Sequence, residues 1–600
     1  MRRCLAAAAG LAISMAGSTS PAQTIYPIDR AEILAGARFD FKVEFSGLID
    51  PTKVSISLNG EDYAKAFGKT ANFIEREDGK DQSALILRDV SLARPGNYKI
   101  HVTDGVQSRE VTWSVYDTGP RKAKNVIFFI GDGMSLAHRI AARLLAKGIA
   151  EGKALGKLAI DDMPHMALVA TAGSDSIITD SANSASAYAT GHKSAVNAMG
   201  VYADRTIDPL DDPRVESITS LVKRRLGMAV GIITNTEIED ATPAAMVAHV
   251  RRRSEYDRIV EQYFAAKPDV LMGGGKANFL PKGADGAKRK DEVDFLARFR
   301  EAGYSIALTG PEMASAAAEP ATSKLLGLFT LGNMDGVLDR KFLKRGTVGK
   351  FPEQPDLTEQ VSAALAVLSK NEAGFFLMVE SGLIDKYTHL LDMERAAYHT
   401  IMLDSADRLA RDWASARGDD TLIFVLADHN HPIGLVGTIE DDMSKEPNVA
   451  MRERVRVYER AGFPNYGTPD AEGYPARVDV SRRLALFSAS LPDHYETYRP
   501  KLDNPNDPTV PGNEAGTYVA NERYKSIPGA VFRFGNLPAM INADVHSGED
   551  VILTAIGPGS DRVHGQMDNT EVFRIIAEAL GLGAGNGTDA RRTQVSPAGQ

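Results

Sequence analysis

Residues 126–133 read Val-Ile-Phe-Phe-Ile-Gly-Asp-Gly, and this stretch decides the fold class. Its first five residues are a continuous apolar run, which is typical of a strand buried on both faces of a sheet. Similar runs recur at residues 228–233, 375–379, 422–426 and 551–556. Segments that predict helices lie between the runs, at residues 216–226, 357–368, 395–414 and 570–580. Strand alternating with helix predicts an α/β fold with a mainly parallel central sheet between helices.

The chain before this stretch follows a different pattern. Phe39, Phe41, Val43 and Phe45 alternate with polar residues, and residues 54–58, 98–102 and 111–115 repeat the period of two. Glycine-containing turns at residues 59–60, 95–96 and 104–105 separate these short runs. Residues 24–117 are therefore predicted to form a small all-β domain, an immunoglobulin-like sandwich. Residues 118–124, with three basic residues after Gly119-Pro120, are predicted to be the linker.

The large α/β domain is predicted to span residues 125–583, with one long insertion. The segment from about residue 439 to about residue 542 is rich in Pro, Tyr, Asn and Asp and has weak periodicity. It is expected to lie near the functional edge of the sheet. Residues 584–600 are predicted to be a disordered tail, because they are rich in small and polar residues.

Composition and charge exclude several classes of protein. The chain has 600 residues, 43% hydrophobic and 25% charged, so it is an ordinary globular protein and not a fibrous or wholly disordered one. Its net charge of −10 argues against a surface that binds nucleic acid. No run approaches the roughly 18 apolar residues that a membrane-spanning helix needs.

The first 22 residues are predicted to be a signal peptide. Met1-Arg2-Arg3 is a basic start, Cys4 to Gly17 is an apolar run, and Ser20-Pro21-Ala22 offers small residues for cleavage after Ala22. The mature protein is therefore expected in the periplasm or outside the cell. It would contain no disulfide bond, because the only cysteine, Cys4, is removed with the signal peptide.

Acidic residues follow three of the buried-type strands. Asp132 follows the first run, Glu380 follows residues 375–379, and Asp428 with His429 follows residues 422–426. A single aspartate in such a place is usually a turn or helix-cap residue. Three at one sheet edge, where α/β proteins bind ligands, instead indicate a cation among the carboxylates, which would otherwise repel one another.

Histidines add to this cluster. Asp385 and His389 are four residues apart, so a helix would place both side chains on one face, as two ligands of one metal ion require. The alternative is a solvated surface pair. His546 precedes the run at residues 551–556 and can reach the same edge.

Ser181 is the candidate nucleophile. Residues 179–187 are packed with small side chains and precede a helix that is expected to end near Gly191. A serine at a helix start lies at the positive end of the helix dipole, which favours an alkoxide and a bound anion. The alternative is an ordinary N-cap serine. The chain has no Gly-x-Ser-x-Gly motif, so a metal-activated serine is favoured over a hydrolase triad.

These fragments together resemble the alkaline phosphatases, over roughly residues 124–582. The matching fragments occur in the family's order and context: Gly131 to Met134, Thr179 to Ala182, Asp240 to Ala245 with His249 and Arg253, Glu380 to His389, Ala427 to His429, and His546. The resemblance implies the family's α/β core and a metal-dependent phosphatase. It also leaves a homodimer open, since family members are commonly dimeric.

Carried over residue by residue, the resemblance implies two zinc ions and one magnesium ion. Ser181 would become phosphorylated. Asp385, His389 and His546 would hold the first zinc, and Asp132, Asp428 and His429 the second. Asp132, Thr242 and Glu380 would hold the magnesium. These donors match the ligands that each metal prefers in proteins.

The resemblance gives four further residues supporting roles. Arg253 would clamp the phosphate with its planar fork. His431 would orient a metal ligand without binding the metal. Asp240 would hold water molecules bound to magnesium, and Lys386 would touch phosphate through water. For this last pair the alternative is a surface ion pair that contributes little.

The predicted function is an exported alkaline phosphatase that hydrolyses phosphate monoesters. Formal charges of three divalent cations, four carboxylates, the Ser181 alkoxide and Arg253 leave about +2, which balances a monoester dianion better than a diester monoanion. The alternatives are a phosphodiesterase or sulfatase of the same superfamily, and a secreted binding protein with a phosphatase-like accessory domain. Ser181 lacks the sequence context of a sulfatase. Diesterases of the superfamily usually lack a counterpart of Arg253.

Overall fold

The computed structural model describes residues 23–436, 466–480, 483–497, 499–503 and 505–583. The predicted signal peptide, the predicted tail at residues 584–600 and the first part of the predicted insertion lie outside these residues. The chain divides into two compact units, one of which comprises Asp40–Val90 and Tyr98–Trp113 with the first described residues. The domain boundaries given above remain predictions. None of the helices within the described ranges is long and apolar enough to cross a membrane.

A ten-stranded sheet forms the centre of the larger unit. Seven of its nine strand pairs are parallel, and β26 runs antiparallel to both of its neighbours. In sheet order the strands are β16 (Ser305–Ala307), β17 (Leu325–Leu328), β15 (Val270–Gly274), β14 (Ala229–Glu237), β18 (Phe375–Ser381), β10 (Asn125–Gly131), β19 (Thr421–Leu426), β26 (Val551–Ile556), β13 (His165–Ala170) and β27 (His564–Asp568). The sheet is therefore mainly parallel, as predicted, and mixed only through β26.

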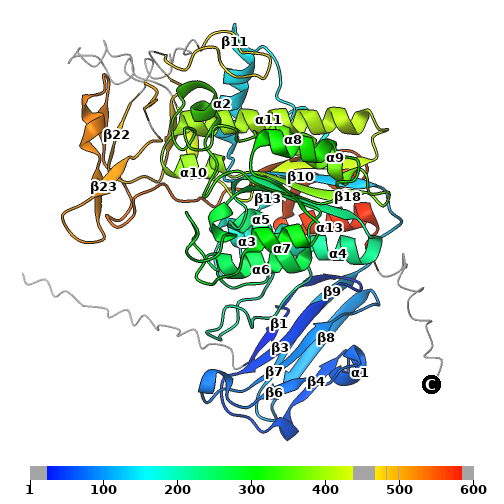
Figure 1. Cartoon of the computed structure of the whole chain (residues 1–600). Coiled ribbons are helices and arrows are strands. Elements are labelled where there is room, and N and C mark those ends of the chain that lie inside the picture. The colour runs from blue at the N-terminus through cyan, green and yellow to red at the C-terminus, as the bar shows by residue number, and fades with distance from the viewer. Residues whose placement is uncertain (1–22, 437–465, 481–482, 498, 504, 584–600) are drawn as a thin grey trace, which may run out of the picture. The chain divides into compact units, whose positions relative to one another are not determined.

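Helices pack on both faces of this sheet (Figure 1). One group comprises α2 (Leu136–Lys147), α8 (Gly310–Ala318), α9 (Leu357–Leu368), α10 (Leu383–His389) and α11 (Met393–Ser415), of which α8, α9 and α11 contact the sheet. The other comprises α3 (Ser181–Thr190), α4 (Ile218–Leu226), α5 (Ala241–Ala245), α6 (Tyr256–Ala266), α7 (Phe295–Glu301) and α13 (Asn569–Leu580). Because β10, β18 and β19 are covered from both sides, every residue of these strands is buried.

The N-terminal residues form two small sheets. One has the order β1 (Gln23–Tyr26), β3 (Phe39–Phe45), β7 (Ala84–Val90), β6 (Asn72–Ile74). The other has the order β2 (Glu32–Leu34), β9 (Ser108–Tyr116), β8 (Gly96–Thr103), β4 (Ser55–Leu58), β5 (Glu61–Asp62), and the short helix α1 (Tyr63–Phe67) follows β5. Phe41 and Trp113 meet edge to face in the core, with ring centroids 5.9 Å apart. The β character is confirmed, whereas an immunoglobulin-like arrangement remains a prediction.

Strand β3 differs from the alternating pattern in one respect, because its polar face is buried as well. Lys42 is buried and lies 2.7 Å from Glu77 and 3.4 Å from Glu44, measured between Nζ and the nearer carboxylate oxygen. Buried charges are tolerated when they are paired in this way. Alternation therefore predicted the strand correctly but did not predict that its polar face is covered.

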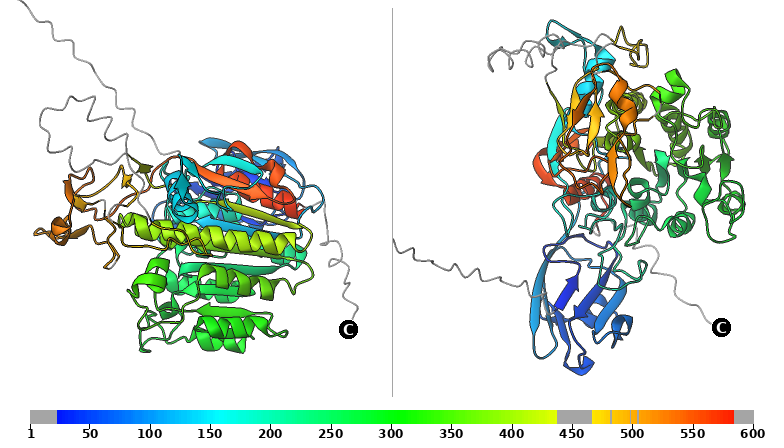
Figure 2. Two further views of the ribbon diagram at one scale, coloured as in Figure 1. Left: turned by 90° about the horizontal axis from the view of Figure 1, so that it is seen from above. Right: turned by 90° about the vertical axis from the view of Figure 1, so that its left-hand side faces the viewer.

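The described part of the insertion consists of short antiparallel pairs. β21 (Leu486–Ser488) pairs with β20 (Ile433–Leu435), β22 (His494–Glu496) with β25 (Val531–Arg533), and β23 (Thr509–Pro511) with β24 (Tyr518–Ala520). Figures 1 and 2 show the orange strands β22 and β23 in a lobe beside the central sheet. A last short pair, β11 (Ile149–Ala150) with β12 (Lys153–Ala154), follows α2.

Candidate active site

Three neighbouring parallel strands bring the predicted carboxylates together. In the sheet, β10 lies between β18 and β19, so Asp132, Glu380 and Asp428 stand at the carboxyl ends of adjacent strands. All three side chains are buried. Burial, and then repulsion by Asp385 and Asp428, raises the pKa of Asp132 well above its usual value. Carboxylates gathered in this way favour a bound cation.

One cluster of possible metal ligands contains Asp132, Asp428 and His429, with one ligand atom from each within 4.8 Å of the others. His429 Nε2 lies 3.2 Å from Asp132 Oδ1 and 3.4 Å from Asp428 Oδ2. The Asp428 carboxylate is held in place, because the backbone N–H groups of Gly133 and His429 both donate to its Oδ1 at 3.0 Å. The three residues that the sequence assigned to the second zinc therefore lie side by side.

The other cluster of possible ligands contains Asp385, His431 and His546, and it shares His429 with the first. Asp385 Oδ1 lies 2.7 Å from His431 Nε2 and 3.4 Å from His546 Nε2, and the predicted ligand His389 also contacts it, with Nε2 at 3.2 Å. Asp385 and His389 are both on α10, so the expected helical spacing is confirmed. Burial alone would raise the pKa of Asp385, but the three histidines lower it well below its usual value.

Hydrogen bonds fix the tautomers of the two predicted histidine ligands in this cluster. His389 Nδ1 lies 2.6 Å from the carbonyl oxygen of Asp544, and His546 Nδ1 lies 2.9 Å from that of Thr179. A carbonyl oxygen can only accept, so Nδ1 carries the hydrogen in both rings. In the neutral rings both Nε2 atoms therefore present lone pairs, 3.2 Å from each other and close to Asp385 Oδ1. Acceptors that face one another require a cation between them.

Ser181 faces the first of these clusters. Its Oγ lies 3.1 Å from His429 Nε2 and 3.4 Å from Asp132 Oδ1. It is the first residue of α3, and Asp180 is the N-cap, with a side chain that accepts from the backbone N–H of Asn183. The N-cap alternative for Ser181 is therefore wrong, because Asp180 caps the helix and leaves the serine hydroxyl available. The helix ends at Gly191, as expected.

Arg253 and Lys386 form an ion-pair network around Asp240. Arg253 Nη2 lies 2.6 Å from Asp240 Oδ1 and Nη1 lies 3.3 Å from Asp180 Oδ2, while Lys386 Nζ lies 2.9 Å from Asp240 Oδ2. Burial by itself would raise the pKa of Asp240, but Lys386 and Arg253 lower it below its usual value. Asp240 and Lys386 thus form a pair that is linked to Arg253 and Asp385, and not an isolated surface ion pair.

The remaining predicted magnesium ligands are Thr242 and Glu380. Thr242 is buried in α5, and its Oγ1 has no hydrogen-bond partner within the described part of the chain. Glu380 Oε2 accepts hydrogen bonds from Thr234 Oγ1 and, at 3.2 Å, from Thr236 Oγ1. Burial raises the pKa of Glu380 to about 7. An unsatisfied hydroxyl and a buried carboxylate are hard oxygen donors of the kind that magnesium prefers.

His431 lies between Asp385 and Asp544 and contacts both. Nε2 contacts Asp385, and Nδ1 lies 2.8 Å from Asp544 Oδ2. Burial alone would lower the pKa of His431, but the hydrogen bonds to Asp385 and Asp544 raise it to about 9. Sequence reasoning missed Asp544, Asp180, Thr234 and Thr236. Two of these residues carried a signal, because Asp544 stands two residues before His546 and Asp180 stands directly before Ser181.

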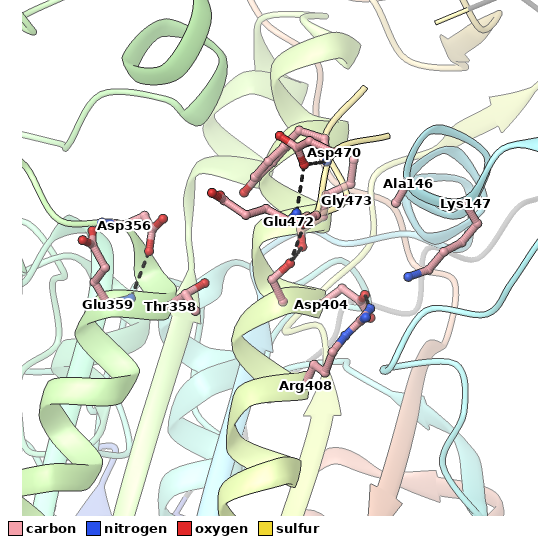
Figure 3. Close-up of a pocket in the computed structure, with 14 residues that line it drawn as sticks. Ala146, Lys147, Asp356, Thr358, Glu359, Asp404, Arg408, Asp470, Glu472 and Gly473 are labelled. Carbon is pink, nitrogen blue, oxygen red and sulfur yellow. Dashed lines mark hydrogen bonds and ion pairs between the residues drawn. The ribbon is translucent and has the colours of Figure 1, made fainter. Parts of the chain in front are cut away.

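A separate cavity of about 580 Å³ contains none of the predicted site residues. Figure 3 shows Lys147 and Arg408 on one side of it and Asp356 and Glu359 on the other. Its walls come from α2, α9, α11 and residues 470–474. It lies apart from the clustered side chains described above, and the chemistry of those side chains defines the candidate site.

Comparisons with known proteins identify the family. The sequence model described as "Alkaline phosphatase" matches residues 123–582. The tissue-nonspecific alkaline phosphatase of Gallus gallus is 28% identical over 506 residues, which cover 77% of this chain and 85% of that protein. The alkaline phosphatase of Escherichia coli K12 is 33% identical over 353 residues, which cover 53% of this chain and 72% of that protein.

Solved structures give the same result for the fold. The alkaline phosphatase of Thermus thermophilus superposes with a TM-score of 0.54 at 24% identity, covering 78% of this chain and 93% of that one. That of the Antarctic bacterium TAB5 superposes with a TM-score of 0.52 at 21% identity, covering 77% and 99%. Since the family model spans most of the sequence, this chain belongs to the alkaline phosphatase family and is a phosphomonoesterase.

Proposed function

We propose that this protein is an exported phosphomonoesterase that acts through a phosphoserine at Ser181, at a site with two zinc ions and one magnesium ion. The observation that carries the proposal is the position of Ser181 Oγ, 3.1 Å from His429 Nε2 and 3.4 Å from Asp132 Oδ1, beside a buried set of carboxylates and imidazoles. Ser181 is the only serine that the sequence analysis proposed as nucleophile, and its hydroxyl lies beside two of the predicted metal ligands.

The donor groups suit the proposed metals. Asp385, His389 and His546 would hold one zinc, and Asp132, Asp428 and His429 the other. The lone pairs of His389 and His546 that converge near Asp385 support the first position, because without a cation three acceptors would face one another. Asp132, Thr242 and Glu380 would hold magnesium, and the unsatisfied hydroxyl of Thr242 supports that position. When bound, such ions stabilise the charge that develops on the entering and leaving oxygens of phosphoryl transfer.

The protein's own residues would bind the phosphoryl group and supply the nucleophile. The Arg253 guanidinium, which Asp180 and Asp240 orient, would bind two phosphoryl oxygens. The Ser181 oxygen attacks phosphorus in line and the alcohol leaves, which gives phosphoserine. The N-terminus of α3 favours the ionised Ser181 oxygen as nucleophile and as leaving group. Water then attacks the phosphoserine, which releases phosphate and restores the hydroxyl.

Hydrolysis of p-nitrophenyl phosphate and of bis-p-nitrophenyl phosphate tests the proposal, with zinc and magnesium supplied. We expect strong preference for the monoester at alkaline pH and loss of this activity in Ser181→Ala. Ser186→Ala, in the same helix and outside the site, is the matched control and should retain activity. A preference for the diester, or activity that survives in Ser181→Ala, would contradict the proposal.

Export is proposed from residues 1–22, which lie outside the described part of the chain. N-terminal sequencing of the protein from a periplasmic or secreted fraction should begin at Gln23, directly after the expected cleavage site. Retention of Met1 in that fraction would contradict cleavage after Ala22.

A further inference from the structure

Asp544 connects three parts of the active site and was not assigned a role by the sequence. It is only 1% exposed and stands two residues before His546. Its Oδ2 lies 2.8 Å from His431 Nδ1, and its Oδ1 accepts hydrogen bonds from Ser488 Oγ and Ser490 Oγ, both at 2.6 Å. In all three of these contacts the Asp544 carboxylate is the acceptor and the other side chain is the donor.

The main chain of Asp544 contacts a second residue of the site. Its carbonyl oxygen accepts from His389 Nδ1 at 2.6 Å, and its N–H donates to the carbonyl oxygen of His389 at 3.0 Å. One residue thus orients His389 through its backbone and His431 through its side chain. His431 in turn lies 2.7 Å from Asp385 Oδ1, so both predicted ligands on α10 depend on Asp544 for their orientation.

The two serines come from the insertion. Ser488 is the last residue of β21, which pairs with β20 directly after the segment that carries His429 and His431. Ser490 Oγ also accepts a hydrogen bond from the backbone N–H of Val545 at 3.4 Å, and so holds the chain just before His546. The insertion is therefore bonded to the metal-ligand segment at the Asp544 side chain and at the backbone next to His546.

We propose that Asp544, clamped by Ser488 and Ser490, is a positioning residue that sets the affinity of the Asp385–His389–His546 position for zinc. This inference rests on the proposed function, because it needs a metal at that position. Residues that orient metal ligands typically contribute 10- to 100-fold to metal affinity. Through Ser488 and Ser490, the insertion would then increase the affinity of this position for zinc.

The alternative is that Asp544 only stabilises the fold. Both roles predict a lower melting temperature when the carboxylate is removed, so stability alone cannot separate them. Zinc affinity can, because a purely structural residue would leave the dissociation constants of both zinc ions unchanged in the folded protein.

The experiment is titration of zinc into the full-length mature protein against a chromophoric chelator of known affinity. The variants are Asp544→Asn, which keeps the size of the side chain, the double variant Ser488→Ala/Ser490→Ala, and Asp479→Asn. Asp479 is an exposed aspartate of the same insertion and serves as the matched control. The double variant keeps Asp544 itself, so it tests the clamp even if Asp544→Asn does not fold.

We expect the dissociation constant of one zinc to rise about 10- to 100-fold in Asp544→Asn, with the other zinc unchanged. The double serine variant should show a smaller rise for the same zinc, and Asp479→Asn should match wild type. Unchanged zinc affinities in both test variants would overturn the inference and leave the proposed function intact. A wild-type protein that binds no pair of zinc ions would instead overturn the proposed function, and this inference with it.

Discussion

Arg253 is positioned by two carboxylates before any substrate arrives. Its Nη2 contacts Asp240 and its Nη1 contacts Asp180, so the plane of the guanidinium is already fixed. Burial by itself would lower the pKa of Arg253, but Asp240 and Asp180 raise it, and the side chain therefore stays charged at alkaline pH. A lysine ammonium has only three donors on one atom, so it could not contact both carboxylates and two phosphoryl oxygens at the same time.

Arg253→Lys should lower kcat/KM for p-nitrophenyl phosphate. A hydrogen bond to a charged group contributes about 1.5–3 kcal/mol, so losing one such contact with the phosphoryl group corresponds to a fall of roughly 10- to 150-fold. Steady-state kinetics measure this, with Arg252→Lys at the exposed neighbouring position as control. Equal kcat/KM in Arg253→Lys and wild type would exclude Arg253 from phosphate binding.

For individual residues, the sequence predicted the candidate metal ligands better than the residues that hydrogen-bond to them. Asp132, Glu380 and Asp428 stand directly after buried-type runs, so their position followed from strand direction alone. The contacts of Asp544 with Ser488 and Ser490 join it to residues of the aperiodic insertion that are more than 50 positions away in the chain. No local pattern encodes such contacts.

Among the secondary-structure elements, β10 packs against both the helix that begins at Ser181 and the strand that leads to Asp428. Phe128, in the middle of the strand, packs edge to face on Tyr188 of α3 and on Phe424 of β19, with centroids 5.9 and 6.2 Å apart. Tyr188 also donates a hydrogen bond to the carbonyl oxygen of Ala427, next to Asp428, at 2.8 Å. The helix that begins at Ser181 and the strand that leads to Asp428 therefore share one aromatic cluster.

Phe128→Ala should destabilise the protein by about 3–5 kcal/mol, because it leaves a cavity in a well-packed core. Leu168→Ala is the control, since Leu168 on β13 is 46% exposed and should cost less than about 1 kcal/mol. Urea denaturation with saturating zinc and magnesium measures both. If the two variants unfold at the same urea concentration, the aromatic cluster does not stabilise the site.

The boundaries of elements were predictable where a cap marks them. α9 spans Leu357–Leu368 as expected, and Asp356 and Glu359 form a reciprocal capping box at its start. α11 begins at Met393, earlier than the expected 395, because Asp392 provides the cap. The direction of β26 was not readable from its apolar run. The chain enters β26 from the insertion and not from a crossover helix, and this allows the antiparallel pairing.

At the scale of the whole molecule, metal ions and stability should be coupled through the buried carboxylates. Without metal, burial raises the pKa of Glu380 to about 7, from an ordinary value of 4.5. A carboxyl group with a raised folded-state pKa contributes stability that is complete below its unfolded pKa and is lost as the pH rises through its folded pKa. A bound metal replaces the proton, so the loaded protein does not incur this loss.

Chelation should therefore lower the melting temperature more at about pH 8.5 than at about pH 5.5. Differential scanning calorimetry of the metal-loaded and the metal-free protein at the two pH values measures the difference. Glu380→Gln should reduce the pH dependence in the metal-free protein, because its side chain does not titrate. If the difference in melting temperature between metal-loaded and metal-free protein is the same at both pH values, the carboxylates do not couple metal binding to folding.

The most direct test of the central claim is the covalent state of Ser181 during turnover. Enzyme mixed with excess p-nitrophenyl phosphate is quenched in acid, digested, and mapped by mass spectrometry, with Ser181→Ala treated in the same way. We predict one phosphorylated peptide, which contains Ser181, and none in Ser181→Ala. A wild-type enzyme that turns over without phosphorylated Ser181, or one phosphorylated at another residue, would contradict the proposed mechanism.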